Sequence, residues 1–272
     1  MIPGVSSDTL VTSNSIGAAP RIAWRLATVI ENVSETPSAR TIVLDVPDWP
    51  GHRAGQHVDV RLTAEDGYQT ERSYSIASAP EDTHLVLTVE RLADGEVSPY
   101  LADQLRAGDQ LELRGPIGGY FVWEVAVGGP LFLAAGGSGI VPLMAMLRHR
   151  EAALSARGVE ARVELPARLL YSSRSWDEVI YRDELARLAV VDPTLEVRHT
   201  LTRKVPGGWN GFHRRIDREM LTEVAWPPSE RPRVYVCGPT PLVESVAASL
   251  VDLGHQPELV KTERFGPTGG RI

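Results

Sequence analysis

Cysteine is almost absent from this sequence, and its scarcity excludes several classes of site. The 272 residues contain one cysteine, Cys237. A single cysteine cannot form an intramolecular disulfide framework, which needs cysteines in pairs. An iron–sulfur cluster held by cysteines needs about four thiolates, so we expect no such cluster within these residues. No metal site of another kind is predicted either.

Long apolar runs and runs of like charge are also missing. No stretch approaches the roughly 18 continuous apolar residues of a membrane-spanning helix. Residues 1–8 lack a basic region followed by an apolar one, so no secretory signal is predicted. The formal net charge is −7, which gives no basic field to attract nucleic acid. We therefore expect a monomeric, cytoplasmic protein without nucleic-acid or membrane partners, and a flexible tail over residues 1–20.

Hydrophobic residues follow different periods in the two halves of the chain. In the first half they alternate with polar residues, as Val58, Val60 and Leu62 do. A period of two is typical of antiparallel strands that have one face in water. Residues 21–127 are therefore predicted to form an antiparallel β-barrel, with one short helix between residues 97 and 108.

The second half contains continuous apolar runs with helical patterns between them. Residues 131–135 and 234–236 are two such runs, which are typical of strands buried on both faces. One helical stripe is predicted from Trp176, Val179, Ile180 and Leu188. Alternating strands and helices indicate a doubly wound parallel sheet. Residues 128–272 are therefore predicted to form an α/β domain.

The segment Arg72-Ser73-Tyr74-Ser75 is the first candidate for a cofactor site. On a strand, Arg72 and Tyr74 share one face, and Ser73 and Ser75 share the other. A guanidinium can donate two hydrogen bonds to a pyrophosphate, and a tyrosine can stack on a flat ring. Taken alone, however, these four residues are better explained by an edge strand with an exposed arginine and a packed tyrosine.

Two glycine-containing segments follow. In Gly95-Glu96-Val97-Ser98, a serine at a helix start leaves backbone N–H groups that suit a diphosphate. In Gly115-Pro116-Ile117-Gly118, the glycines allow the backbone to approach a ligand closely. Each segment alone is equally compatible with an ordinary helix cap or a turn between domains.

Taken together, Arg72-x-Tyr74-Ser75, Gly95-x-x-Ser98 and Gly115-Pro116-x-Gly118 resemble the flavin-binding motifs of the ferredoxin–NADP⁺ reductase superfamily, in its FAD-binding form. The resemblance implies that Arg72 and Ser98 hold the FAD pyrophosphate and that Tyr74 packs on the isoalloxazine. It also implies that Ser75 forms a hydrogen bond near flavin N5. The further FAD-binding residues that we assign on this resemblance are Ser73, Val89, Arg91, Gly95 and Val97.

A glycine-rich loop follows the apolar run 131–135. Glycines between a buried strand and a helix form a phosphate cradle, although a lone motif of this kind is weak evidence. Gly137-Ser138-Gly139-x-x-Pro142 resembles the nicotinamide-nucleotide loop of the same superfamily, with proline where a third glycine would stand. The simpler alternative is a tight turn from strand to helix.

Four further residues bear on the choice of nucleotide. Ser173 and Arg174 resemble positions that contact the ribose 2′-phosphate in NADPH-dependent relatives, and Arg203 and Arg215 resemble other basic positions of that pocket. Several cations favour a 2′-phosphate because it carries close to two negative charges. NADPH is therefore expected in preference to NADH, although scattered solvated arginines would look the same.

The last candidates lie in the C-terminal third of the chain. Cys237-Gly238-Pro239-Thr240 resembles the family's segment beside the nicotinamide, although a free cysteine is often simply a small core residue. Glu263 and Phe265 resemble its terminal acid and the aromatic residue that covers the flavin. The chain continues to Ile272 with a glycine-rich tail, which departs from relatives that end at the aromatic residue.

The resemblance implies hydride transfer from a nicotinamide to FAD, with Ser75, Cys237, Glu263 and Phe265 lining the catalytic site. Electrons are then expected to pass to a separate acceptor, such as a ferredoxin, a flavodoxin or an oxygenase component. A ferric-siderophore or free-flavin reductase is an alternative. Another is an electron-transfer flavin subunit of a larger redox complex.

Overall fold

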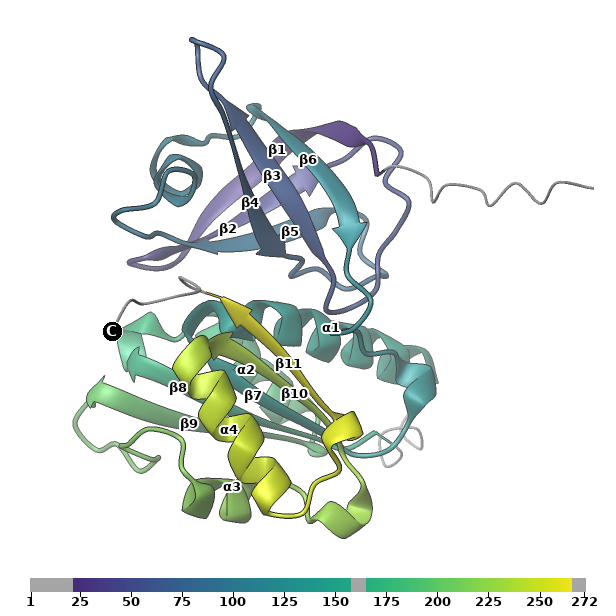
Figure 1. Cartoon of the computed structure of the whole chain (residues 1–272), viewed down its shortest axis with the longest axis vertical. Coiled ribbons are helices and arrows are strands. Elements are labelled where there is room, and N and C mark those ends of the chain that lie inside the picture. Colours follow the sequence, from purple (N-terminus) through teal and green to yellow (C-terminus); the bar gives the residue numbers. More distant parts are fainter. Residues whose placement is uncertain (1–21, 158–164, 266–272) are drawn as a thin grey trace, which may run out of the picture.

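The computed structural model describes residues 22–157 and 165–265, which form two units, each built on its own sheet (Figure 1). The first sheet ends at Ile117 and the second begins at Leu131. The domain limits given above stay predictions, and the predicted N-terminal tail lies outside the described residues.

The first unit is a six-stranded antiparallel sheet in the order β4-β3-β6-β1-β2-β5. Its strands are β1 (Trp24–Thr36), β2 (Ala39–Asp45), β3 (His57–Thr63), β4 (Gln69–Ser75), β5 (Leu85–Glu90) and β6 (Gln110–Ile117). An isolated antiparallel bridge between Ile76 and Leu87 joins the two ends of this order, so the sheet curls into a barrel. Closure protects the edge strands from pairing with other chains.

The alternation predicted in the first half is confirmed in β3. Val58 and Val60 are fully buried in the barrel core. Asp59 and Arg61 point outward, where Asp59 accepts a hydrogen bond from Arg114 at 3.0 Å and Arg61 donates to Glu112 at 2.7 Å. The antiparallel barrel therefore forms because one side of each strand is apolar and the other is polar.

The helix predicted between residues 97 and 108 is shorter than expected. It is a π-helix of 5 residues, Tyr100–Gln104. The side chain of Asn32 donates to the carbonyl oxygens of Leu101 (3.2 Å) and Leu105 (2.9 Å), and so satisfies groups that a longer helix would have used. The sequence alone could not show this contact, because Asn32 comes from β1.

The second unit is a five-stranded parallel sheet in the order β11-β10-β7-β8-β9. Its strands are β7 (Leu131–Gly136), β8 (Ala167–Ser175), β9 (Leu195–Lys204), β10 (Arg233–Pro239) and β11 (Val260–Phe265). Its α-helices are α1 (Ile140–Arg157), α2 (Arg182–Val191), α3 (Arg218–Val224) and α4 (Thr240–Asp252). The doubly wound parallel sheet predicted from the apolar runs is confirmed.

Helices cover both faces of this sheet (Figure 1). Leu133 and Leu169 pack in one core with residues of α1 and α2. Phe132 and Leu170, their chain neighbours, pack in a second core with residues of α3 and α4. Neighbouring strand residues point to opposite faces, so a strand buried on both faces has to be apolar throughout.

One helical stripe was predicted wrongly. Trp176, Val179 and Ile180 lie before α2, in a 3₁₀ turn (Trp176–Glu178) and an extended segment, and only Leu188 lies in the helix. Tyr181 adopts a left-handed conformation (φ 58°) immediately before α2 and so breaks the chain direction there. The three residues are apolar because they pack on the sheet and not because they share a helix face.

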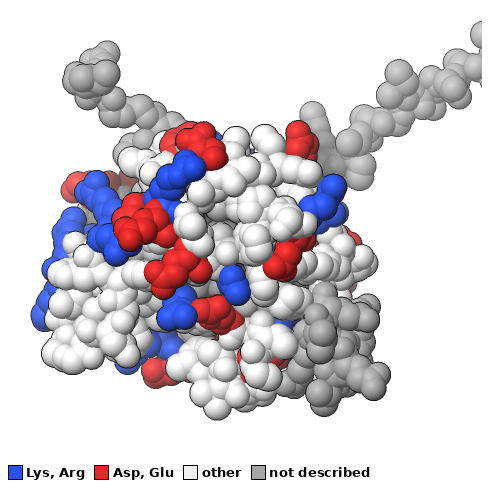
Figure 2. All heavy atoms as spheres, turned by 90° about the horizontal axis from the view of Figure 1, so that it is seen from below, with Lys and Arg blue, Asp and Glu red and all other residues white. Residues whose placement is uncertain are grey.

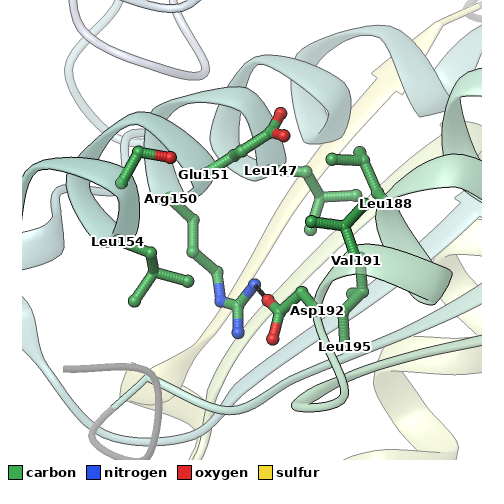
Figure 3. Close-up of a pocket in the computed structure, with 9 residues that line it drawn as sticks. Leu147, Arg150, Glu151, Leu154, Leu188, Val191, Asp192 and Leu195 are labelled. Carbon is green, nitrogen blue, oxygen red and sulfur yellow. Dashed lines mark hydrogen bonds and ion pairs between the residues drawn. The ribbon is translucent and has the colours of Figure 1, made fainter. Parts of the chain in front are cut away.

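A buried arginine fastens α1 to the turn between α2 and β9 (Figure 3). The Arg150 side chain is 2% exposed. It forms an ion pair with Asp192 and donates to the Leu165 carbonyl (2.6 Å) and the Thr194 hydroxyl (2.7 Å). A buried cation is tolerated only when such partners surround it, so this cluster is structural.

Arg148 joins the α/β domain to the barrel. Its guanidinium, on α1, donates to both carboxylate oxygens of Glu184 (2.9 and 2.6 Å) and to the barrel carbonyl of Ala77 (2.7 Å). The Tyr181 ring lies beside it, 4.9 Å from centroid to guanidinium carbon, and the Tyr181 hydroxyl bonds to Thr88 of the barrel. These contacts fix how the two units sit against each other.

Viewed from the side of the α/β domain, acidic and basic side chains are interspersed (Figure 2). This face therefore offers no broad field of one sign. Within residues 22–157 and 165–265, none of the helices combines the length and hydropathy needed to cross a bilayer.

Candidate active site at the domain boundary

A cleft of about 470 Å³ lies where the barrel meets the carboxyl ends of β10 and β11. Ligands bind at the carboxyl ends of strands in open α/β sheets, and a volume of this order suits a cofactor ring. The predicted site residues that line the cleft are Ser73, Ser75, Ser138, Cys237, Glu263 and Phe265. Residues far apart in the sequence therefore meet in one place.

Ser75 and Glu263 make direct contact inside this cleft. The Ser75 hydroxyl donates a hydrogen bond of 3.3 Å to a carboxylate oxygen of Glu263. Glu263 is also the β11 partner of Cys237 in the parallel register of β10 and β11. A hydroxyl, a carboxyl and a thiol thus stand together at the domain boundary.

Burial changes the ionisation of two of these groups. Desolvation raises the pKa of Glu263 to about 7, against the hydrogen bond from Ser75, which lowers it. Desolvation and the nearby Glu263 charge raise the pKa of the Cys237 thiol well above its ordinary value. Glu263 can therefore take up or release a proton near neutral pH, whereas Cys237 stays neutral and acts as a small apolar side chain.

The turn Gly137–Gly139 between β7 and α1 requires glycine for steric reasons. A Cβ on Gly139 would lie 2.2 Å from the carbonyl oxygen of Cys237. The Gly137 carbonyl accepts a hydrogen bond of 3.1 Å from the Tyr171 hydroxyl. Pro142 is buried in the first turn of α1, where its missing N–H leaves no bond unmade. Backbone thus packs directly on backbone beside the cleft.

The residues that follow Cys237 lie at the edge of the cleft. Gly238 is buried against the backbone of Gly136, which lies 3.2–3.3 Å from the position of a Cβ. Pro239 is exposed and Thr240 begins α4. Their predicted contacts with a nucleotide stay predictions.

The predicted pyrophosphate residues gather near one another but do not line the cleft. Arg72 forms an ion pair of 3.1 Å with Glu96, which lies between Gly95 and Ser98. The Ser98 hydroxyl accepts the Leu92 N–H at 3.1 Å, and a Cβ on Gly95 would lie 2.8 Å from that oxygen. The Gly95-x-x-Ser98 spacing therefore closes a loop beside Arg72.

The other predicted FAD residues differ in what they can offer. Val89 and Val97 have side chains buried in the barrel core, so only their backbone could touch a cofactor. Arg91 is exposed and pairs with Asp103 at 2.7 Å. Tyr74 is partly buried against the barrel core, and desolvation raises its pKa to about 12.

Of the predicted nucleotide-selecting residues, Ser173 and Arg174 lie in β8 and Arg203 lies in β9. Arg215 lies in the segment before α3, next to Arg214, whose carbonyl accepts a hydrogen bond from Thr200 of β9. The Thr202 hydroxyl bonds to the Ser173 carbonyl at 3.3 Å, which brings Ser173 beside Arg203. Arg203 and Arg215 are exposed and form no ion pair with other described residues. Arg174 differs, because it pairs with Glu90 at 3.1 Å and with Glu178 at 3.0 Å.

Several cleft residues were not predicted. Gly55 and His57 approach from the start of β3, where His57 pairs with Ser75 in the antiparallel register. Gly55 is confined to glycine, since its Cβ would lie 1.9 Å from the carbonyl oxygen of Phe121. Burial lowers the pKa of His57. The sequence signal for these residues is a glycine shortly before a strand, in Gly55-Gln56-His57. This signal does not indicate a site unless the pairing of β3 with β4 is known.

The residues present suit a flavin. The cleft has glycine backbone on one wall, at Gly118 and Gly119, and an aromatic side chain on another, at Phe265. Ser75 and Glu263 supply the hydroxyl and carboxyl that can bond to a polar ring edge. No group of side chains within the described residues could hold a metal ion.

Comparisons with known proteins agree with this geometry. Residues 27–122 match the model of the oxidoreductase FAD-binding domain, and residues 133–248 match that of the oxidoreductase NAD-binding domain. The chain belongs to the FAD- and NAD-binding oxidoreductases of the ferredoxin–NADP⁺ reductase superfamily. The resemblance carried by the Arg72, Gly95 and Gly137 motifs is thereby confirmed.

Two relatives of this superfamily are components of oxygenases. The glycine betaine monooxygenase reductase subunit of Pseudomonas aeruginosa is 29% identical over 266 residues, which is 95% of this chain and 70% of the relative. Methane monooxygenase component C of Methylosinus trichosporium is 33% identical over 181 residues, which is 66% of this chain and 48% of the relative.

Solved structures share the two-domain fold. A cytochrome P450 reductase from Amycolatopsis has a TM-score of 0.77 at 23% identity and covers 95% of this chain and 74% of its own. A ferredoxin NADP⁺ reductase from Neisseria gonorrhoeae has a TM-score of 0.72 at 22% identity and covers 89% of this chain and 98% of its own. The barrel and the α/β domain are therefore a shared architecture.

Proposed function

We propose that this protein is an FAD-dependent NAD(P)H reductase that delivers electrons to a separate acceptor. The observation that carries the proposal is the contact of Ser75 with Glu263 in a cleft between the two domains, beside Cys237. When bound, FAD would supply the hydride-accepting and electron-releasing chemistry, which amino-acid side chains do not provide. The protein would orient the flavin and the nicotinamide and exclude water.

The chain's own residues would divide this work between the two ends of the cofactor. Arg72 and the Gly95–Ser98 loop would bind the pyrophosphate of FAD, with Arg72 exchanging part of its pairing with Glu96 for phosphate oxygens. Ser75 would donate to the polar edge of the ring. Glu263, with a pKa of about 7, would hold or release a proton near the ring.

Phe265 would cover the ring from the α/β side, where it is partly buried against the core. A nicotinamide that stacks on the flavin would have to displace it. The glycine-rich segment that follows Phe265 begins at residue 266, outside the described residues.

An oxygenase component is the acceptor class we favour, because the relatives above are a monooxygenase reductase subunit and a component of methane monooxygenase. The 272 residues contain one cysteine, so a cysteine-ligated cluster would have to belong to the acceptor or to another part of the electron path. Ferredoxins and flavodoxins fit the same chemistry. A ferric-siderophore or free-flavin reductase remains the alternative.

We further propose NADPH as the preferred nucleotide. Arg203 at the end of β9 and Arg215 before α3 support this choice, since both are exposed cations without ion-pair partners among the described residues. Arg174 contributes less than the sequence indicated, because two carboxylates already neutralise it.

Purification and spectroscopy test the proposal. The protein should carry or take up FAD, and anaerobic NADPH should bleach the flavin absorbance faster than NADH does. A colourless protein that cannot be reconstituted with FAD would overturn the central claim. An acceptor screen would then compare oxygenase components and ferredoxins with ferric siderophores and free flavin, and reduction of only the small molecules would favour the alternative.

A further inference from the structure

Glu90 places a carboxylate beside the predicted nicotinamide-nucleotide loop. It ends β5 in the barrel, and its Oε1 accepts a hydrogen bond of 3.1 Å from Arg174, which follows Ser173 near the carboxyl end of β8 in the other domain. Its second oxygen lies 3.7 Å from the position of a Cβ on Gly137. The carboxylate therefore stands between the glycine loop and a cation.

Two nitrogens of the Arg174 guanidinium donate to carboxylates of its own chain. Glu178 accepts from Nε at 3.0 Å, while Glu90 accepts from Nη2. The Glu90 side chain is 21% exposed and that of Arg174 is 48% exposed, so the pair is partly shielded from solvent. An unpaired carboxylate in this place would repel a phosphate.

The position matters because of what the loop is built to bind. A glycine-rich turn between a parallel strand and a helix presents backbone N–H groups to a diphosphate. Gly137 has a positive φ of 54°, which L-residues with a side chain rarely adopt, so its backbone is committed to this turn. Arg203 is not part of this loop, because it lies on β9, the edge strand next to β8.

We propose that Glu90 is a positioning residue for the nucleotide site. Its carboxylate occupies the position of an anion between Gly137 and Arg174, and the nucleotide diphosphate displaces it when the nucleotide binds. This inference rests on the proposed function. On binding, Arg174 exchanges Glu90 for a phosphate oxygen, a bidentate or charge-assisted contact that guanidinium groups favour. Glu90 thus weakens the binding of every nucleotide that carries the 5′-diphosphate, with or without a 2′-phosphate.

The test uses the FAD-loaded, oxidised protein and titration calorimetry with NADP⁺, NAD⁺ and ADP. Glu90→Gln keeps the size of the side chain and removes its charge. We expect the Kd of all three ligands to fall by about twofold to fivefold, the range of a partly exposed ion pair. In the Arg174→Gln background, Glu90→Gln releases no cation, so it relieves only the repulsion between an unpaired Glu90 and the phosphate, and the gain should be smaller.

Glu151→Gln is the matched control. It changes the net charge equally and removes a carboxylate that bonds Arg187 at 3.0 Å. Glu151 lies 11 residues into α1 from Ile140, about 16 Å along the helix from the loop. Its Kd values should equal those of the wild type.

Three results would overturn the inference. Unchanged or weaker binding in Glu90→Gln would show that the carboxylate does not compete with the nucleotide. Tighter binding of NADP⁺ alone would place the effect of Glu90 at the 2′-phosphate. Equally tighter binding by Glu151→Gln would show that only the net charge of the protein matters. A wild-type protein that takes up FAD but binds none of the ligands would instead contradict the proposed NAD(P)H site, so the two failures are distinguishable.

Discussion

The Ser75 hydroxyl donates a hydrogen bond of 3.3 Å to Glu263 across the boundary between the barrel and the α/β domain, over a sequence separation of 188 residues. One partner ends β4 and the other lies in β11, the last described strand. Because the two halves of the site are joined at this point, the ionisation of Glu263 depends on how the domains are docked. That dependence can be measured.

Replacement of Glu263 should change how stability depends on pH. Burial raises its pKa from 4.5 to about 7 in the folded protein. A raised pKa means that the native state holds the proton more tightly, so the stability it confers is present below about pH 4.5 and is lost as the pH rises towards 7. Between pH 5 and pH 8, the unfolding free energy of the wild-type protein should therefore fall by about 2–3 kcal/mol relative to that of Glu263→Gln.

Denaturant unfolding at several pH values gives this difference. Glu258→Gln, a change in the 3₁₀ turn that precedes β11, serves as the control, and its stability should follow the wild type at every pH. If the unfolding free energies of the wild type and Glu263→Gln changed with pH in the same way, the raised pKa would be contradicted.

The sequence predicted the parts of the site that obey local rules. Alternation in β3 and the apolar runs of β7 and β10 identify the barrel and the α/β domain because each strand shows its burial in its own residues. The glycine loop at 137–139 was visible for the same reason. The hydrogen bond from Ser75 to Glu263 was not, since it depends on domain docking.

Gly139→Ala tests the close approach of backbone to backbone in this loop. Its Cβ would lie 2.2 Å from the Cys237 carbonyl oxygen, so the turn or β10 has to move. We expect a loss of about 1–3 kcal/mol in unfolding free energy and weaker nucleotide binding. Gly207→Ala is the control, because nothing lies within 4 Å of its Cβ and its stability should change little. Equal stability of the two variants would argue against the observed packing.

Arg150→Met should destabilise the α/β domain strongly. The change removes the cation that Asp192 pairs with and leaves the Leu165 carbonyl without its 2.6 Å donor. Breaking a buried pair on one side costs about 3–5 kcal/mol. Arg187→Met removes an ion pair to Glu151 whose arginine is 52% exposed, and it should cost less than about 1 kcal/mol. Thermal or denaturant unfolding of both variants makes the comparison.

The wrongly predicted helical stripe and the ion pair of Arg174 with the barrel show the same limit of sequence reasoning. Trp176, Val179 and Ile180 are spaced like a helix face, but the left-handed Tyr181 starts α2 only after them. Arg174 resembles a residue that binds a 2′-phosphate, yet Glu90 of the barrel reaches it through space. Spacing reports which residues face one way on a regular element; it does not report backbone reversals or charges supplied by another domain.

Arg203 and Arg215 should together set the preference for NADPH. Both are exposed, Arg203 at the end of β9 and Arg215 before α3, and neither has an ion-pair partner among the described residues to give up. Replacing either with Gln removes a charge-assisted contact to the 2′-phosphate and should raise the Kd of NADP⁺ about tenfold, with the Kd of NAD⁺ within about twofold of wild type. Arg198→Gln, on the same strand but paired with Glu196 at 2.7 Å, is the control and should alter neither. Equal losses for NADP⁺ and NAD⁺ would assign these arginines to the diphosphate, and no loss for either would place the 2′-phosphate elsewhere.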